Sequence, residues 1–106
     1  FNKHDINDDA KIELDKIVKI MNENPEVNIE LGSHTDCVGS SVYNMWLSKK
    51  RAKSAAKYIA GRITNAERIL SQGYGETRPT NDCKCWNCSN DDHRANRRTE
   101  FVIVPQ

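Results

Sequence analysis

The spacing of apolar residues near the start of the chain predicts an amphipathic helix. Asn7 and the two aspartates after it are typical of a helix start, because short polar side chains accept hydrogen bonds from the first free backbone N–H groups. Apolar residues then recur at helical spacing as far as Met21. Pro25 disfavours helical geometry in the residue before it, so we expect the first helix over about Asp8–Asn24.

The spacing of apolar residues also predicts the remaining elements. Alternation of apolar and polar residues predicts strands, a long apolar stripe at helical spacing predicts a helix, and runs rich in polar residues, glycine or proline predict loops. In order, we expect a strand over Val27–Leu31 closed by Gly32, a polar loop over Ser33–Gly39, a second helix from Ser40 or Ser41 to Ala60, a strand over Ile69–Gly75, a long loop over Glu76–Ser89, a helix-like turn, and a last strand over Thr99–Val104.

This order predicts an α+β fold. With a short strand added at the start, the chain is β-α-β-α-β-loop-β, a βαβαββ-type mixed sheet with helices packed on one face. A length of 106 residues fits a single domain over residues 1–106. Phe1 begins abruptly in what resembles the middle of a strand, so we expect the chain to be the C-terminal part of a longer protein.

Charge narrows the classes of partner. Charged residues make up 29% of the chain, yet they nearly balance and leave a formal net charge of +1. That balance argues against nonspecific attraction to nucleic acid or to an anionic membrane. Two adjacent arginines near the end, Arg97 and Arg98, lack the surrounding basic patch of a nucleic-acid site. We therefore expect recognition by charge to be local.

The cysteines allow two interpretations. An even number in a small domain, here Cys37, Cys83, Cys85 and Cys88, fits two disulfides formed in an oxidising compartment. The same cysteines with His93 offer soft ligands for zinc, although the two C-x2-C pairs typical of many structural zinc sites are not both present. We favour disulfides, and we expect no bound metal and no cofactor.

One face of the second helix carries the candidate binding residues. Asn44, Leu47, Ser48 and Arg51 share a side of the helix, and this mostly polar face differs from the alanine stripe, so we do not expect the core to need it. Asp36 lies in the loop that leads into the same helix. Asp36 and Arg51 are suited to the ammonium and the carboxylate of a small zwitterion. A structural ion pair, or two unrelated surface charges, remains the alternative.

The sequence supports a catalytic site less well than a binding site. Ser33, His34 and Asp36 offer a nucleophile, a base and an acid, but neighbours in sequence rarely point at one reaction centre, and no G-x-S-x-G turn is present. We expect His34 to be a hydrogen-bonded residue at a strand end, and we expect the protein not to be an enzyme.

Three separated motifs resemble those of a known family. The chain resembles the OmpA-like C-terminal domain, the peptidoglycan-associated module of outer-membrane proteins, lipoproteins and flagellar stator proteins. The resemblance covers nearly the whole chain, and its motifs are His34-Thr35-Asp36 with Gly39, Asn44, Leu47-Ser48 and Arg51-Ala52; Gly73-Tyr74-Gly75-Glu76 with Pro79; and Asn96-Arg97-Arg98-Thr99-Glu100.

The resemblance implies a binding site for diaminopimelate, the zwitterionic residue of the peptidoglycan stem peptide. It assigns the ligand contacts to Asp36 and Arg51. The other residues that it places at the site are Asn44 and Arg97 lining the pocket, Leu47 packing beside them, Thr35 supporting the loop, and Asn2 facing the ligand from the opening strand.

The cysteines depart from the general family pattern. We favour Cys83–Cys88 with Cys37–Cys85, and the alternative is Cys85–Cys88 with Cys37–Cys83; either would staple the motif beside the ligand site. Trp86, between the cysteines, is interpreted as a loop anchor more readily than as a surface for stacking on sugars.

The resemblance also implies a cellular setting. It predicts a non-covalent anchor in the periplasm of a Gram-negative-type bacterium, held to the outer membrane through the region before Phe1. Competing hypotheses are a zinc-binding or redox module on the same scaffold, and the peptidoglycan-binding part of a flagellar-type stator.

Overall fold

The computed structural model describes residues 6–104, which form a three-stranded mixed sheet with helices. The elements, in order, are α1 (Asp8–Glu23), β1 (Asn28–His34), α2 (Ser41–Ala60), the short 3-10 turn η1 (Ala66–Arg68), β2 (Ile69–Gly75), a second turn η2 (Cys85–Asn87), α3 (Asn90–Asn96) and β3 (Arg98–Val104). The predicted α+β class is confirmed. The opening strand that we expected, including Asn2, lies outside the described residues.

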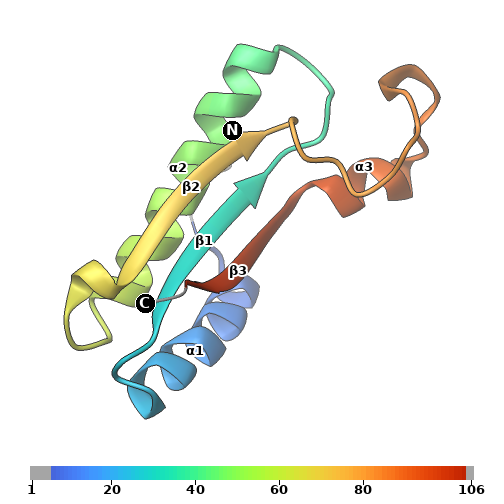
Figure 1. The fold of residues 1–106 in the computed structure, drawn as a ribbon. Helices are drawn as coiled ribbons and strands as arrows, with labels where there is room; N and C mark the ends of the chain where they lie inside the picture. The colour runs from blue at the N-terminus through green and yellow to red at the C-terminus, as the bar shows by residue number, and fades with distance from the viewer. Residues whose placement is uncertain (1–5, 105–106) are drawn as a thin grey trace.

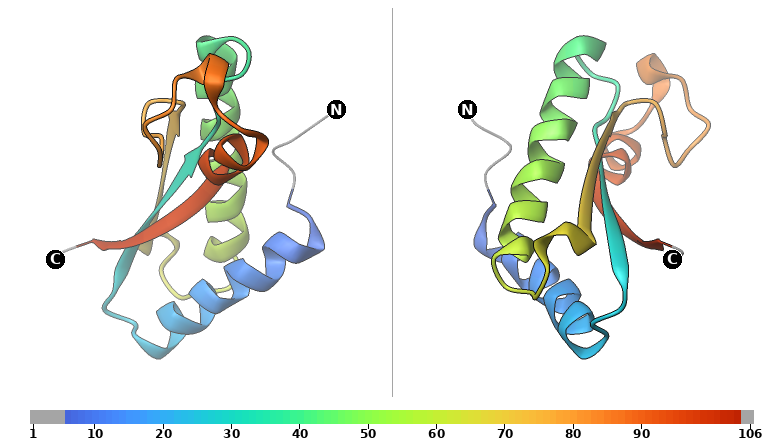
Figure 2. Two further views of the ribbon diagram at one scale, coloured as in Figure 1. Left: turned by 90° about the vertical axis from the view of Figure 1, so that its right-hand side faces the viewer. Right: turned by 60° about the vertical axis from the view of Figure 1, so that its left-hand side comes forward.

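The sheet has the strand order β2-β1-β3, with β1 parallel to β2 and antiparallel to β3. Figure 1 shows β1 in the middle of the sheet, and Figure 2 shows α1 and α2 on the same side of it. The prediction that these two helices share one face is therefore confirmed. The short α3 lies beyond the end of the sheet, next to the start of β3 (Figure 1).

The core fills the space between this face and the two long helices. Its buried members are Leu14, Ile17 and Met21 of α1, Ile29 and Leu31 of β1, Ala55 and Ile59 of α2, and Ile69 of β2. Most come from the apolar stripes and alternations in the sequence. No helix among residues 6–104 is long and apolar enough to cross a membrane.

The structure corrects the end of β1. The strand does not close at Gly32 but continues through Ser33 and His34, and both of these polar residues are buried. Their side chains have partners across the sheet, since Ser33 Oγ lies 3.2 Å from Thr99 Oγ1. Gly32 is required by packing, because a Cβ there would lie 2.9 Å from the ring of Tyr74. The glycine therefore marks a close contact rather than the end of the strand.

The region before β3 contains a helix that the spacing of apolar residues did not predict beyond a helix-like turn. Ser89 begins α3 with a capping box: its hydroxyl accepts from the Asp92 N–H, and the Asp92 carboxylate accepts from the Ser89 N–H, each at 3.0 Å. The Ser-x-x-Asp spacing was the available signal.

Candidate binding site

The candidate site is built on the loop that joins β1 to α2. Thr35 donates its backbone N–H to the Gly75 carbonyl at 2.9 Å, which ties the start of the loop to the end of β2. Its hydroxyl donates to the Asp36 carbonyl, also at 2.9 Å. The Asp36 carboxylate in turn accepts from the Val38 N–H at 3.0 Å. Thr35 is therefore in a position to support the loop that carries Asp36.

Arg97 brings a guanidinium to this loop from the far end of the chain. It forms an ion pair with the Asp36 carboxylate, whose side chain is 11% exposed against 44% for Arg97. Antiparallel pairing explains the meeting, because His34 is opposite Arg98 in the register of β1 and β3. The residues just beyond that pair, Asp36 and Arg97, are consequently held at the same edge of the sheet.

Arg51 completes a cluster of three charged groups. Burial lowers the pKa of Arg51, the nearby Arg97 lowers it further, and Tyr43 and Asp36 raise it. The guanidinium nevertheless stays protonated, since arginine does not lose its proton in proteins. Arg51, Arg97 and Asp36 thus lie within electrostatic range of one another. Such a cluster is suited to a ligand that offers a carboxylate together with an ammonium group.

Arg51 also borders a hollow in the surface between α1, α2 and β3. The hollow measures about 460 Å³ and is lined by Arg51 and Ala55 of α2, by Leu14 of α1 and by Phe101 of β3, among others. Asp36, Asn44 and Arg97 do not line it. We therefore place the site at the charged cluster, where the groups that can recognise a zwitterion meet, rather than at the centre of the hollow.

Asn44 holds the loop from the second helix. Its side-chain nitrogen lies 3.3 Å from the Asp36 carbonyl, 3.1 Å from the Val38 carbonyl and 3.2 Å from the Glu76 carboxylate. The side chain is buried, with the residue 4% exposed. The donors of this amide are therefore directed at the protein. This gives Asn44 a positioning role, and Glu76 is a partner that the sequence analysis did not identify.

The face of α2 that carries these residues is buried, contrary to the expectation that the core does not need it. Leu47 is 7% exposed and Ser48 is fully buried, where its hydroxyl accepts from the Gly75 N–H at 2.8 Å. Gly73 lets the helix approach this closely, because a Cβ there would lie 2.4 Å from the Lys49 nitrogen. The polar side chains of Asn44 and Ser48 can be buried here because hydrogen bonds to β2 and to the neighbouring loops satisfy them.

His34 lies on the face of the sheet opposite to α2. Its imidazole Nε2 is 3.2 Å from the Glu100 carboxylate, and its ring stacks on Tyr74 with the ring centres 5.2 Å apart. Ser33 points to the other side of the strand, as successive strand residues do. Ser33, His34 and Asp36 therefore do not converge on a reaction centre, and His34 is a hydrogen-bonded residue at the strand end, as predicted.

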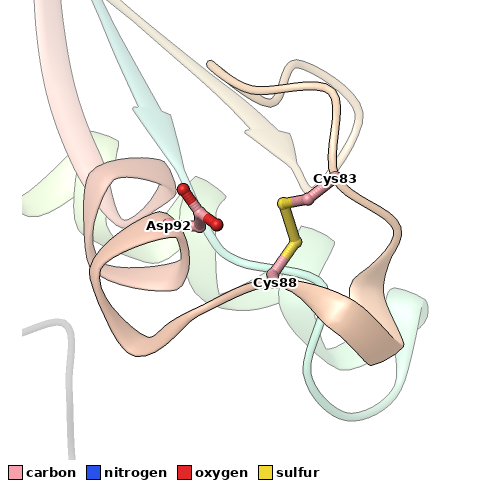
Figure 3. Close-up of side chains that lie close together, drawn as sticks. All are labelled: Cys83, Cys88 and Asp92. Atoms are coloured by element: carbon pink, nitrogen blue, oxygen red, sulfur yellow. A yellow bond between two sulfur atoms is a disulfide. The ribbon is translucent and has the colours of Figure 1, made fainter.

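Two disulfides connect the long loop to the candidate site and to itself. Cys37 pairs with Cys85 and Cys83 pairs with Cys88, which is the pairing favoured above. Asp92 lies close enough to Cys83 and Cys88 for the three side chains to resemble a metal-binding group. Figure 3 shows, however, that the two sulfur atoms are bonded to each other. Zinc binds cysteine as a thiolate, so this group does not fit zinc in the oxidised protein.

Comparisons with known proteins agree with this architecture. The OmpA family model matches residues 1–97. The chain belongs to the OmpA family. The resemblance to the OmpA-like peptidoglycan-binding domain is confirmed, and with it the expectation of a binding domain that is not an enzyme.

The relatives that match the chain are much longer than the chain. The chain is 33% identical to a segment of the photosystem I P700 chlorophyll a apoprotein A2 of Gloeobacter violaceus, with 97% of the chain and 12% of that protein covered. It is 29% identical to outer membrane porin F of Pseudomonas fluorescens over 100% of the chain and 31% of the porin. The chain thus spans less than a third of these two relatives.

Solved structures share the fold at low sequence identity. The C-terminal domain of Helicobacter pylori MotB superposes with a TM-score of 0.82 at 24% identity, covering 100% of the chain and 82% of that domain. The peptidoglycan-associated lipoprotein of Burkholderia pseudomallei also reaches 0.82, at 21% identity, covering 98% and 85%. At these identities the likeness establishes the fold alone.

Proposed function

We propose that this OmpA-family domain binds peptidoglycan through the diaminopimelate of the stem peptide. The observation that carries the proposal is the cluster of Asp36, Arg97 and Arg51 at the loop between β1 and α2. In this assignment Asp36 accepts from the ammonium group of the ligand, and the two guanidinium groups donate to its carboxylate.

The ion pair between Asp36 and Arg97 has a consequence for binding. Because Arg97 binds one oxygen of the carboxylate and the Val38 N–H donates to the other, the ligand's ammonium would share the second oxygen with Val38, or would displace Arg97 toward the ligand's own carboxylate. Either arrangement keeps each charge paired, which matters because an unpaired charge in a half-buried site is costly. Asn44 and Thr35 hold the loop. In this assignment Leu47 packs beside them as an apolar neighbour, and Asn2 stays a prediction outside the described residues.

Binding at a single site is expected to be modest, because a few charge-assisted hydrogen bonds of about 1.5–3 kcal/mol each must also offset the entropy lost on association. Peptidoglycan repeats its stem peptides, so many copies of an anchored protein hold the polymer firmly through avidity. Weak binding to one peptide and firm retention on whole sacculi are both expected.

The decisive experiment titrates the oxidised chain with a diaminopimelate-containing stem peptide by calorimetry. The wild type should saturate, and Arg51→Ala should weaken binding by about 10- to 100-fold, in line with the loss of one charged hydrogen bond. Lys53→Ala removes an exposed cation two residues away and serves as the matched control. A stem peptide with lysine in place of diaminopimelate lacks one carboxylate and should bind weakly. Equal binding of the two peptides would contradict the assignment.

We also propose that the domain works in the periplasm and is tethered to the outer membrane by the region that precedes it. Support comes from relatives whose names place them there, such as outer membrane porin F. MotB, whose domain shares the fold, represents the alternative of a stator. Fractionation of the full-length protein separates the two: recovery with the outer membrane supports the tether, and recovery with the inner membrane supports the stator.

A further inference from the structure

Trp86 is exposed to an unusual degree for a tryptophan. It lies in η2 between the paired cysteines, and 85% of its surface is exposed, more than any other large hydrophobic side chain in residues 6–104. A loop anchor would be buried against the body of the protein. The interpretation of Trp86 as a loop anchor is therefore wrong, and its indole is accessible to a binding partner.

Covalent bonds hold the backbone on both sides of this residue. Cys85, immediately before Trp86, is bonded to Cys37, and the Cys83–Cys88 disulfide closes a small ring around the turn. A hydrogen bond from the Asn87 N–H to the Lys84 carbonyl, at 2.9 Å, completes the turn. The indole is thus presented on a stapled loop, and a rigid aromatic side chain loses little entropy when it binds a partner.

The same disulfide places Trp86 beside the proposed stem-peptide site. The Cα atoms of Cys37 and Cys85 are 5.8 Å apart, and Cys37 directly follows Asp36. One further residue adds at most about 3.8 Å, so the Cα of Trp86 lies within about 10 Å of the Cα of Cys37. Trp86 therefore belongs to a segment that is covalently joined to the loop carrying Asp36.

This separation is within the reach of the proposed ligand. In a stem peptide, diaminopimelate is the third residue, and the first is joined through a lactyl group to an N-acetylated sugar. The two residues and the lactyl group that separate diaminopimelate from the sugar span roughly 10–15 Å when extended, because the second residue is linked through its side-chain carboxyl. A ligand held at Asp36 by its diaminopimelate can consequently bring its sugar to the distance at which Trp86 lies.

Polar residues flank Trp86 within its own loop. Its neighbours Lys84 and Asn87 are exposed polar residues, so the indole is one aromatic plane on a polar loop. A stable protein interface needs a much larger continuous area. The apolar C–H face of a pyranose ring, by contrast, is about the size of one indole. The N-acetyl amides of the sugar suit the polar residues beside Trp86.

We propose that Trp86 is a second subsite, which packs against the N-acetylated sugar that carries the stem peptide. The inference rests on the proposed stem-peptide site and extends it from the peptide to the glycan. The domain then recognises the junction of peptide and sugar, with charges at Asp36 and the arginines holding the peptide and the indole holding the sugar.

The test compares two ligands on the oxidised chain: a free diaminopimelate stem peptide, and the same peptide linked to its disaccharide. By calorimetry, the wild type should bind the linked ligand about three- to tenfold more tightly. Trp86→Ala should abolish this difference and leave the affinity for the free peptide unchanged, and Trp86→Phe should restore part of it. Trp46→Ala, at the other tryptophan of the chain, should retain the difference.

A second measurement reads Trp86 directly. In a Trp46→Phe variant the only tryptophan is Trp86, and its emission should shift with the linked ligand but not with the free peptide. The sugar subsite would be overturned, and the peptide site left intact, if the wild type bound the two ligands with equal affinity. The same holds if Trp86→Ala weakened the binding of both ligands equally. Failure of the free peptide to bind would instead refute the proposed function, and the subsite with it.

Discussion

Arg97 donates to the carboxylate of Asp36, although the two residues are 61 positions apart in the chain. The contact joins the loop after β1 to the residue just before β3, so it depends on the correct pairing of these two strands. The ion pair of Asp36 and Arg97 therefore requires the correct fold and also forms part of the proposed site.

Replacing Asp36 with asparagine should weaken binding of a diaminopimelate stem peptide by about 10- to 100-fold. The amide is isosteric and can still accept from the Val38 N–H, but it no longer balances the ligand's ammonium or Arg97. Titration calorimetry measures the loss, and urea denaturation checks that the fold is retained. Asp91→Asn, which changes an exposed carboxylate paired with Arg94 on α3, is the control and should bind as the wild type does. Wild-type affinity in Asp36→Asn would rule out a role for its charge.

Asn44→Ala should act through stability before it acts on the ligand. The substitution removes the side-chain donor to the Val38 carbonyl and one of the two side-chain donors to the Asp36 carbonyl, the other being the Thr35 hydroxyl, which costs about 1–3 kcal/mol of unfolding free energy. Urea denaturation measures this loss, with Asn87→Ala, an exposed asparagine, as the control. Weaker peptide binding should accompany the loss because the loop is no longer held. A stable variant with weakened binding would instead indicate that Asn44 contacts the ligand itself.

The two disulfides should contribute unequally to stability. Cys37–Cys85 joins residues 48 positions apart, whereas Cys83–Cys88 joins residues 5 apart. Loop-closure entropy then predicts that replacing the first pair with serines costs roughly 2 kcal/mol more than replacing the second. Denaturation of the two double variants compares them directly. The first variant should also bind the stem peptide less well, since the staple beside Asp36 is gone, and a larger stability loss from the shorter loop would contradict the prediction.

Stability should decline in mild acid because of His34. Burial, followed by the charge of Arg98, lowers the pKa of His34 below its ordinary value of 6.5, with Arg78 acting in the same direction and Glu100 in the opposite one. The unfolded chain therefore binds the proton more readily than the folded one. As pH falls below 6.5 toward the lower folded pKa, the unfolding free energy should fall.

Denaturation curves between pH 7.5 and 5 measure this effect, and His34→Gln supplies the comparison. The variant is expected to lose the part of the pH dependence that belongs to His34, while retaining that of the other titrating groups. An identical pH profile in the two proteins would show that His34 binds its proton equally well in the folded and unfolded states.

Much of the fold was predictable from local patterns. The boundaries of α2 and β2 agree with the sequence analysis, because the Ser40 start, the Gly61 stop and the run over Ile69–Gly75 are local signals. Even α3 had a local signal in its capping box, which the low apolar content of the segment obscured. The candidate residues on α2 were likewise found by motif, since their spacing on one helix is a local property.

Tertiary structure decided what those residues face. No local rule says that Ser48 is buried or that β1 runs on to His34, because both depend on partners supplied by β2 and β3. The ion pair of Asp36 with Arg97 also exists only once antiparallel pairing brings the chain back. The sequence by itself thus determined the elements and the charges available, through short-range periodicity and capping. Burial, pairing and exposure, including that of Trp86, were settled by contacts between segments far apart in the chain.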